Sequence, residues 1–181
     1  MVSSEAVPFS DSHKPQTSTG EDSFDVVIWG TEQDAKDRQE AMKHFAVMKR
    51  VNQVTVIDFL GDIQAGAPNQ KSLERLYNAH IRLLLLTPDF VSQLAENSLF
   101  EVASNALVQR HRPDRDGYRI IPILLRPVDP EMLESDPLLG GLQPLPRNGR
   151  AISQQQSKDE AWMKITNEVK AVLREYRNCL P

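Results

Sequence analysis

The chain has 181 residues, which is enough for one domain with a substantial core and short for two. Its formal net charge of −4 and its pI near 5.6 give no electrostatic reason to expect a nucleic-acid or membrane-surface partner. The only cysteine, Cys179, excludes an intramolecular disulfide and a cysteine metal cluster, and the sequence contains neither a signal peptide nor an apolar run of about 20 residues, so we expect a cytoplasmic protein.

The start of the chain differs in composition from the rest. Residues 1–23 are rich in Ser, Thr, Pro, Asp and Lys and have almost no apolar side chains to bury. Because such a segment cannot offset the entropy of ordering, we predict a disordered leader at 1–23 and a single domain at 24–178. The domain opens with a β-rich run at 24–29, which is the first predicted strand.

Helical and strand patterns alternate through the first half of the domain. An amphipathic helix at 34–50 precedes a strand at 54–59, and the Gly- and Pro-containing loop at 61–69 leads to a short helix around Leu73, Leu76 and Tyr77. The run from Ile81 to Leu86 is continuously apolar apart from Arg82, which is typical of a strand buried on both faces of a parallel sheet. The loop after this central strand is where a ligand of an open α/β sheet is expected.

The second half continues the alternation. A helix at 97–109 and a strand at 118–125 are expected, with Pro122 indicating an edge or bulged position. Five prolines and three glycines make residues 126–150 mostly irregular. A short strand at 151–153 is possible, and Trp162, Ile165 and Val169 share the core-facing side of a long final helix at 158–176. The economical fold is an α/β fold with a parallel sheet.

Three stretches in this order also carry a family resemblance. The first is Asp58 with the loop 61–66, and the second is the central strand with its continuation at 83–92. The third is the strand at 120–125 with Arg126-Pro127 behind it, followed later by 142–146 and by Ala161-Trp162. Together they resemble a Toll/interleukin-1 receptor (TIR) domain of the bacterial kind over about residues 24–175.

The resemblance implies a flavodoxin-like three-layer fold with a mostly parallel five-stranded sheet flanked by helices. It also implies self-association into homo-oligomers or with other TIR domains, often through the loop after the second strand. Many similar domains cleave NAD to nicotinamide and ADP-ribose, or a cyclic form, in signalling or defence, with NAD as substrate and no cofactor. Others act only as scaffolds.

Glu101 is the candidate catalytic residue, because the family's catalytic glutamate lies on the helix after the third strand. Counting forward from Thr87-Pro88 places the family's glutamate one residue to one side of Glu101, and counting back from Ala106-Leu107 places it one residue to the other side. A short insertion near 95–98 would account for this difference. A carboxylate there would stabilise positive charge on the ribose as nicotinamide leaves. Equally, Glu101 is explained as a carboxylate stabilised by a helix N-terminus.

The candidate substrate-binding residues follow the first two strands. The ring of Trp29 could stack on nicotinamide or adenine, and Gly30, beside Thr31, would let a ligand approach the backbone. Core packing for Trp29 and a turn at Gly30 are the favoured alternative. Asp58 could meet a ribose hydroxyl, although capping of the next loop accounts for it better.

The loop after the second strand supplies the candidate partner-binding residues Asp62, Ile63 and Gly66. Turn geometry is the simplest explanation of Gly66, and an exposed Ile63 would favour a partner surface. The four histidines are scattered without metal-ligand spacing, so no metal site is predicted. A phosphoacceptor domain using Asp58 is a remote alternative, because Trp29-Gly30-Thr31 lacks the acidic residues that would hold Mg²⁺.

Overall fold

A parallel sheet forms the centre of the molecule. The computed structural model describes residues 23–51, 54–61, 63, 69–96, 99–110 and 119–179. Over these residues the sheet has four strands in the order β2-β1-β3-β4, and every neighbouring pair is parallel. The strands are β1 (Phe24–Trp29), β2 (Val54–Asp58), β3 (Ile81–Leu86) and β4 (Arg119–Leu124). The predicted α/β fold with a parallel sheet is therefore confirmed.

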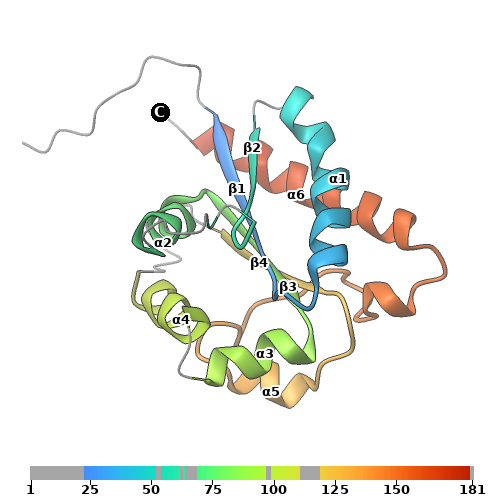
Figure 1. The fold of residues 1–181 in the computed structure, drawn as a ribbon. Coiled ribbons are helices and arrows are strands. Elements are labelled where there is room, and N and C mark those ends of the chain that lie inside the picture. Colours follow the sequence, from blue (N-terminus) through green and yellow to red (C-terminus); the bar gives the residue numbers. More distant parts are fainter. Residues whose placement is uncertain are drawn as a thin grey trace, which may run out of the picture.

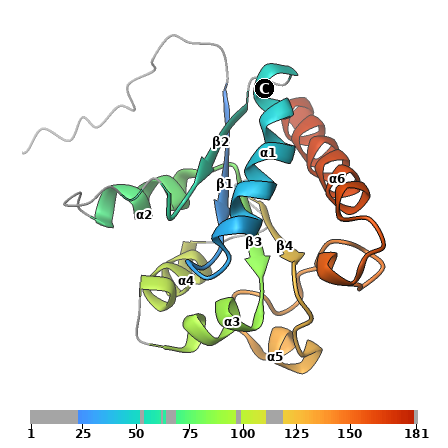
Figure 2. The same cartoon turned by 45° about the vertical axis from the view of Figure 1, so that its right-hand side comes forward.

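Helices cover both faces of this sheet (Figures 1 and 2). On one face lie α1 (Ala35–Val51) and α6 (Lys158–Cys179), which contact each other. The other face carries α2 (Asn69–Asn78), α3 (Pro88–Ala95) and α4 (Leu99–Arg110). The short α5 (Pro130–Ser135) and a 3₁₀ turn, η1 (Ile152–Gln154), complete the elements of the described residues.

The strands divide the core into two layers because successive side chains point to opposite faces. Val26 and Ile28 face α1 and α6, where they share a cluster with Phe45 and Trp162. Trp162 is 1% exposed, which confirms its predicted core role. The opposite cluster contains Val27, Trp29, Leu76, Phe90, Phe100 and Leu107. All six residues of β3 are buried, as expected for a strand covered on both faces.

The expected fifth strand does not appear among the described residues, and η1 replaces the possible strand at 151–153. Leu145 alone pairs beside β4: its N–H donates to the Pro122 carbonyl at 2.8 Å, and its carbonyl accepts from the Leu124 N–H at 2.7 Å. Pro144 and Pro146 flank Leu145, and their rings restrict the backbone dihedral angles on both sides of this isolated bridge. Pro122 itself lies in the edge strand, as predicted.

Two helices were not predicted, and both begin with a proline. Pro88 opens α3 behind the N-cap Thr87, and Pro130 opens α5 behind the N-cap Asp129. Proline is favoured at the first helical position, where its missing N–H would have had no partner. Apart from Ser23, the predicted leader lies outside the described residues. None of the described helices is both long enough and apolar enough to cross a membrane.

Candidate functional site

Polar side chains from three strand exits meet at the carboxyl edge of the sheet. Thr31 and Asp34 follow β1, Thr87 and Asp89 follow β3, and Arg126 follows β4. We call these five residues the carboxyl-edge cluster. In the strand order β2-β1-β3-β4, β2 lies on one side of β1 and β3 lies on the other, so the strand order reverses at β1. Open α/β sheets bind ligands at the carboxyl edge beside such a reversal.

Asp34 is the centre of the carboxyl-edge cluster. Its side chain is 3% exposed, and one oxygen accepts hydrogen bonds from the hydroxyls of Thr31, at 2.6 Å, and Thr87, at 2.9 Å. The other oxygen accepts from the Arg126 guanidinium at 3.2 Å. These three partners compensate the burial of the carboxylate and tie the β1, β3 and β4 exits together.

Arg126 links this buried acid to the surface. It also donates to the half-exposed carboxylate of Asp89 on α3. The hydrogen bond to Asp89 is the largest cause of a raised Arg126 pKa; burial opposes it and the nearby Asp34 charge adds to it. Arg126 is thus held protonated as a bridge between α3 and the exit of β1.

Asp58 is engaged by a second ion pair. Nη1 of Arg38, on α1, donates to Oδ1 of Asp58 at 2.6 Å. The stem of Arg38 lies against Gly30, where an added Cβ would be 3.1 Å from both Cγ and Cδ of Arg38. Gly30 therefore makes room for Arg38. The carboxylate of Asp58 ties α1 to β2, a contact that the sequence did not suggest, and the ribose and capping roles stay predictions.

Trp29 is fully buried. Its ring lies 5.7 Å from that of Phe59, 5.2 Å from that of Phe90 and 5.1 Å from that of Phe100, between centroids. The indole Nε1 has no hydrogen-bond partner among the described residues. Thr31 is also fully buried. This environment favours the packing role for Trp29, and stacking on a ligand would require the aromatic cluster to open.

Glu101 lies in the first turn of α4 and is partly exposed. Its neighbour Phe100 packs under Trp29, whereas Val102 on its other side is 52% exposed. Glu101 therefore sits where α4 passes from the core to the surface.

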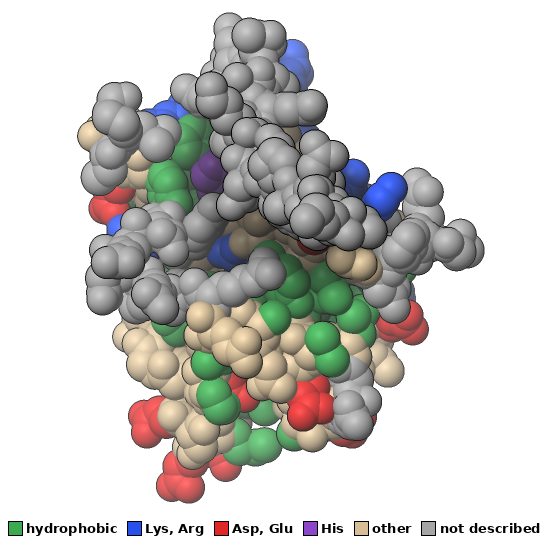
Figure 3. Space-filling model, turned by 90° about the vertical axis from the view of Figure 1, so that its left-hand side faces the viewer, with side chains coloured by type: hydrophobic (Ala, Val, Ile, Leu, Met, Phe, Trp, Pro, Cys, Tyr) green, Lys and Arg blue, Asp and Glu red, His purple; other side chains and the backbone are tan. Residues whose placement is uncertain are grey.

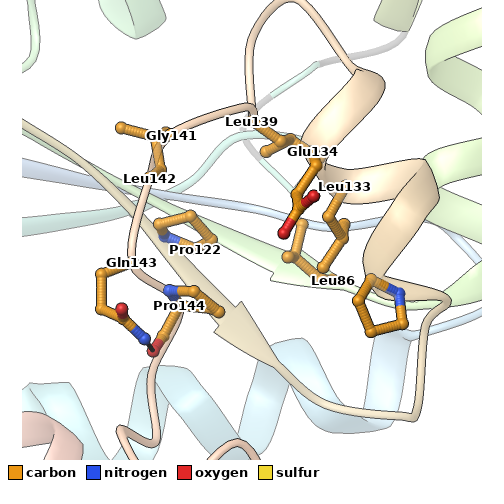
Figure 4. A pocket seen from close by; sticks show the side chains of 10 residues that line it. Leu86, Pro122, Leu133, Glu134, Leu139, Gly141, Leu142, Gln143 and Pro144 are labelled. Atoms are coloured by element: carbon orange, nitrogen blue, oxygen red, sulfur yellow. Dashed lines mark hydrogen bonds between the residues drawn. The ribbon is translucent and has the colours of Figure 1, made fainter.

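One hollow formed by described residues lies beside β4. A cavity of about 270 Å³ is walled by Leu86, Pro122, Leu139 and Pro144, among others, and the carboxylate of Glu134 points into it (Figure 4). Two more open hollows, of about 280 and 460 Å³, lie beside α6 and α5. Within the described part of the chain, Glu101 and Trp29 line none of these three cavities.

The loop after β2 is only partly described. Asp62 and Gly66 lie outside the described residues. Ile63 is half-buried: it packs against the core cluster of Trp29 and its N–H donates to the Leu60 carbonyl at 3.3 Å. Figure 3 shows hydrophobic side chains grouped on the side of the molecule that carries α2 and α4. Val102 and Val108 are the exposed apolar residues of α4.

No protein-family model matches the sequence, and no curated protein gives a significant match. Functional inference therefore depends on the motifs and the geometry. Sequence reasoning missed Asp34, Arg38, Asp89 and Arg126. Two sequence features could have indicated these residues. Arg126 is a charged residue directly after the predicted strand at 118–125, and Arg38 is a charged residue at a core-facing position one helical turn after Asp34.

Proposed function

We propose that this chain is a TIR-type domain that self-associates and hydrolyses NAD, with Glu101 as the essential carboxylate. The observation that carries the proposal is the place of Glu101: a partly exposed carboxylate in the first turn of α4, on the segment that follows the central strand β3. The strand order β2-β1-β3-β4 supports it, being the order of a flavodoxin-like sheet that lacks a fifth strand.

The proposed chemistry needs little from the protein beyond charge and position. Nicotinamide is a cationic leaving group in NAD, so the bond from its nitrogen to the ribose breaks without a general acid. The electron pair goes to the ring nitrogen, positive charge builds up on the ribose, and water adds to that carbon with loss of a proton. Glu101 would stabilise the developing charge, as carboxylates do in glycoside hydrolysis.

The carboxyl-edge cluster supports this role indirectly. Asp34 bonds to the Thr87 hydroxyl, and Thr87 caps α3 by accepting from the Phe90 N–H at 3.1 Å. The cluster thereby fixes the start of the segment that leads to Glu101. Fixed geometry at the reacting groups is what makes electrostatic catalysis effective.

The test is NAD cleavage by the purified chain at high concentration, with nicotinamide measured by chromatography. Glu101→Gln keeps the shape of the side chain, and we expect it to lower release by about a hundredfold or more. Glu96→Gln is the matched control, because Glu96 is an exposed carboxylate that ends α3. The proposal fails if the parent chain releases no nicotinamide, or if Glu101→Gln and the parent release it equally.

A non-catalytic TIR scaffold is the second candidate. It is favoured by the full burial of Trp29 and Thr31. In that case the chain releases no nicotinamide but self-associates through the loop after β2. Light scattering should then show smaller particles for Ile63→Glu, while Val47→Glu, an acid placed at an exposed site on α1, leaves the size unchanged. Thermal melts of both variants check that the fold is kept.

A further inference from the structure

Three potential metal ligands meet on the layer formed by α1 and α6, on the sheet face opposite α2 and α4. Glu40 and His44 lie one turn apart on α1, so their side chains share a side of the helix. Asp159 comes from the first turn of α6. One ligand atom from each residue lies within 4.8 Å of the other two. The packing of α6 on α1 brings the three residues together, and no local sequence motif contains all three.

The imidazole of His44 is held in place from one side. Its ring stacks on Trp162 with 5.8 Å between centroids and 19° between planes, and Trp162 is itself 1% exposed. Only a quarter of the His44 side chain remains accessible. Because a fixed ring loses little entropy on binding a metal, this stacking prepares His44 as a ligand.

The spacing of the donors fits a metal better than a direct hydrogen bond. Nε2 of His44 and Oδ1 of Asp159 are 3.5 Å apart, which is long for a charge-assisted hydrogen bond. Metal bonds of about 2.0–2.1 Å place neighbouring ligands of a tetrahedral zinc ion roughly 3.3 Å apart. Asp159 is 88% exposed, so rotation of its side chain can adjust the position of its carboxylate relative to Glu40 without moving the backbone.

We infer that Glu40, His44 and Asp159 bind a divalent transition-metal ion of the zinc class and thereby tie α1 to α6. One imidazole nitrogen and two carboxylate oxygens suit Zn²⁺, whereas Mg²⁺ and Ca²⁺ prefer oxygen ligands alone. Three protein ligands leave a fourth position for water. This site is separate from Glu101, and it differs from the sequence-based expectation of no metal site.

The sequence concealed the site for a simple reason. The spacing of four between Glu40 and His44 is compatible with a shared metal but is common on helices that bind none. The third ligand, Asp159, lies near the other end of the chain, and only the packing of α6 on α1 brings it to His44.

The experiment uses the tag-free chain of 181 residues after treatment with chelator and dialysis. We expect calorimetric titration with zinc chloride to show one site per chain, and thermal melts to show a higher midpoint with zinc, because the ion binds the folded state. His44→Phe keeps an aromatic ring on Trp162 but cannot ligate, and should weaken binding by at least about tenfold. Glu40→Gln and Asp159→Asn should weaken it too.

Glu160→Gln is the matched control, since it removes a neighbouring exposed carboxylate from the same first turn of α6. It should leave the zinc affinity unchanged. Cobalt substitution should give the visible spectrum of a low-coordinate site without a thiolate band, which separates this site from one at Cys179. Absence of zinc binding by the parent chain, or equal binding by His44→Phe and the parent, would overturn the inference.

Discussion

Arg126 donates a hydrogen bond of 3.2 Å to Asp34 from a position 92 residues further along the chain. This contact closes the carboxyl edge of the sheet, because Asp34 belongs to the β1 exit and Arg126 to the β4 exit. Arg126 is 42% exposed, whereas the Asp34 side chain is 3% exposed. Most of the energetic consequence of breaking the pair therefore falls on the buried acid.

Arg126→Gln should lower the free energy of unfolding by about 1–3 kcal/mol, since it removes the charged partner of a buried carboxylate. Urea unfolding followed by circular dichroism measures the effect. Arg119→Gln provides the comparison, because the pair of Arg119 with Glu175 is exposed on both sides and should contribute little. Equal losses for the two variants would show that the Asp34 contact has no special weight.

Thr87→Ala should cost about 1–2 kcal/mol, because Thr87 has two partners. Its hydroxyl caps α3 at the Phe90 N–H and donates to Asp34. Thr87→Ser keeps the hydroxyl and should retain most of the stability in the same urea experiment. If Ser and Ala destabilise alike, the methyl group of Thr87 matters more than its hydrogen bonds.

The fold was predictable where a pattern is local. The sequence pattern predicted burial for two segments: the continuously apolar strand β3, and the side of α6 that carries Trp162, Ile165 and Val169. The helices that begin at Pro88 and Pro130 were missed because proline also ends regular structure, and only the preceding cap residues separate the two meanings.

The candidate site was predictable only in part, since its contacts join distant segments. Glu101 falls on the predicted helix at 97–109, but the unpredicted α3 precedes that helix, so Glu101 lies on the second helix after β3. The sequence around Asp34 does not indicate that Thr87 and Arg126 are its partners. Parallel pairing of the strands brings these distant residues to Asp34. The burial of Trp29 likewise depends on Phe59, Phe90 and Phe100, which come from three different segments.

Trp29→Ala should destabilise the fold by about 3–5 kcal/mol, the usual cost of a large cavity in an aromatic core. Trp29→Phe should cost much less, because it keeps a ring against Phe90 and removes an indole N–H that has no partner among the described residues. Thermal melts measure both. If NAD cleavage is found, a Trp29→Phe enzyme with normal stability and lost activity would argue that the indole contacts the substrate.

His80 makes stability depend on pH in a direction that the structure defines. Its Nδ1 accepts a hydrogen bond of 3.1 Å from the Asp25 N–H, and its ring lies 5.0 Å from that of Phe24. Burial lowers the pKa of His80 below its ordinary 6.5; the charge of Asp25 opposes this shift and that of Arg82 adds to it. The folded state therefore holds the neutral imidazole, which can accept from Asp25.

Because the unfolded chain takes up this proton more readily than the folded one, the contribution is fully present above about pH 6.5 and is lost as the pH falls below it. His80→Asn offers a carbonyl oxygen to the Asp25 N–H but does not titrate. We expect urea unfolding of the parent chain to show stability falling from about pH 7.5 to about pH 5, and a shallower fall for His80→Asn. Parallel pH profiles for the two chains would mean that other groups carry the dependence, and stability that rises on acidification through His80 would contradict the lowered pKa.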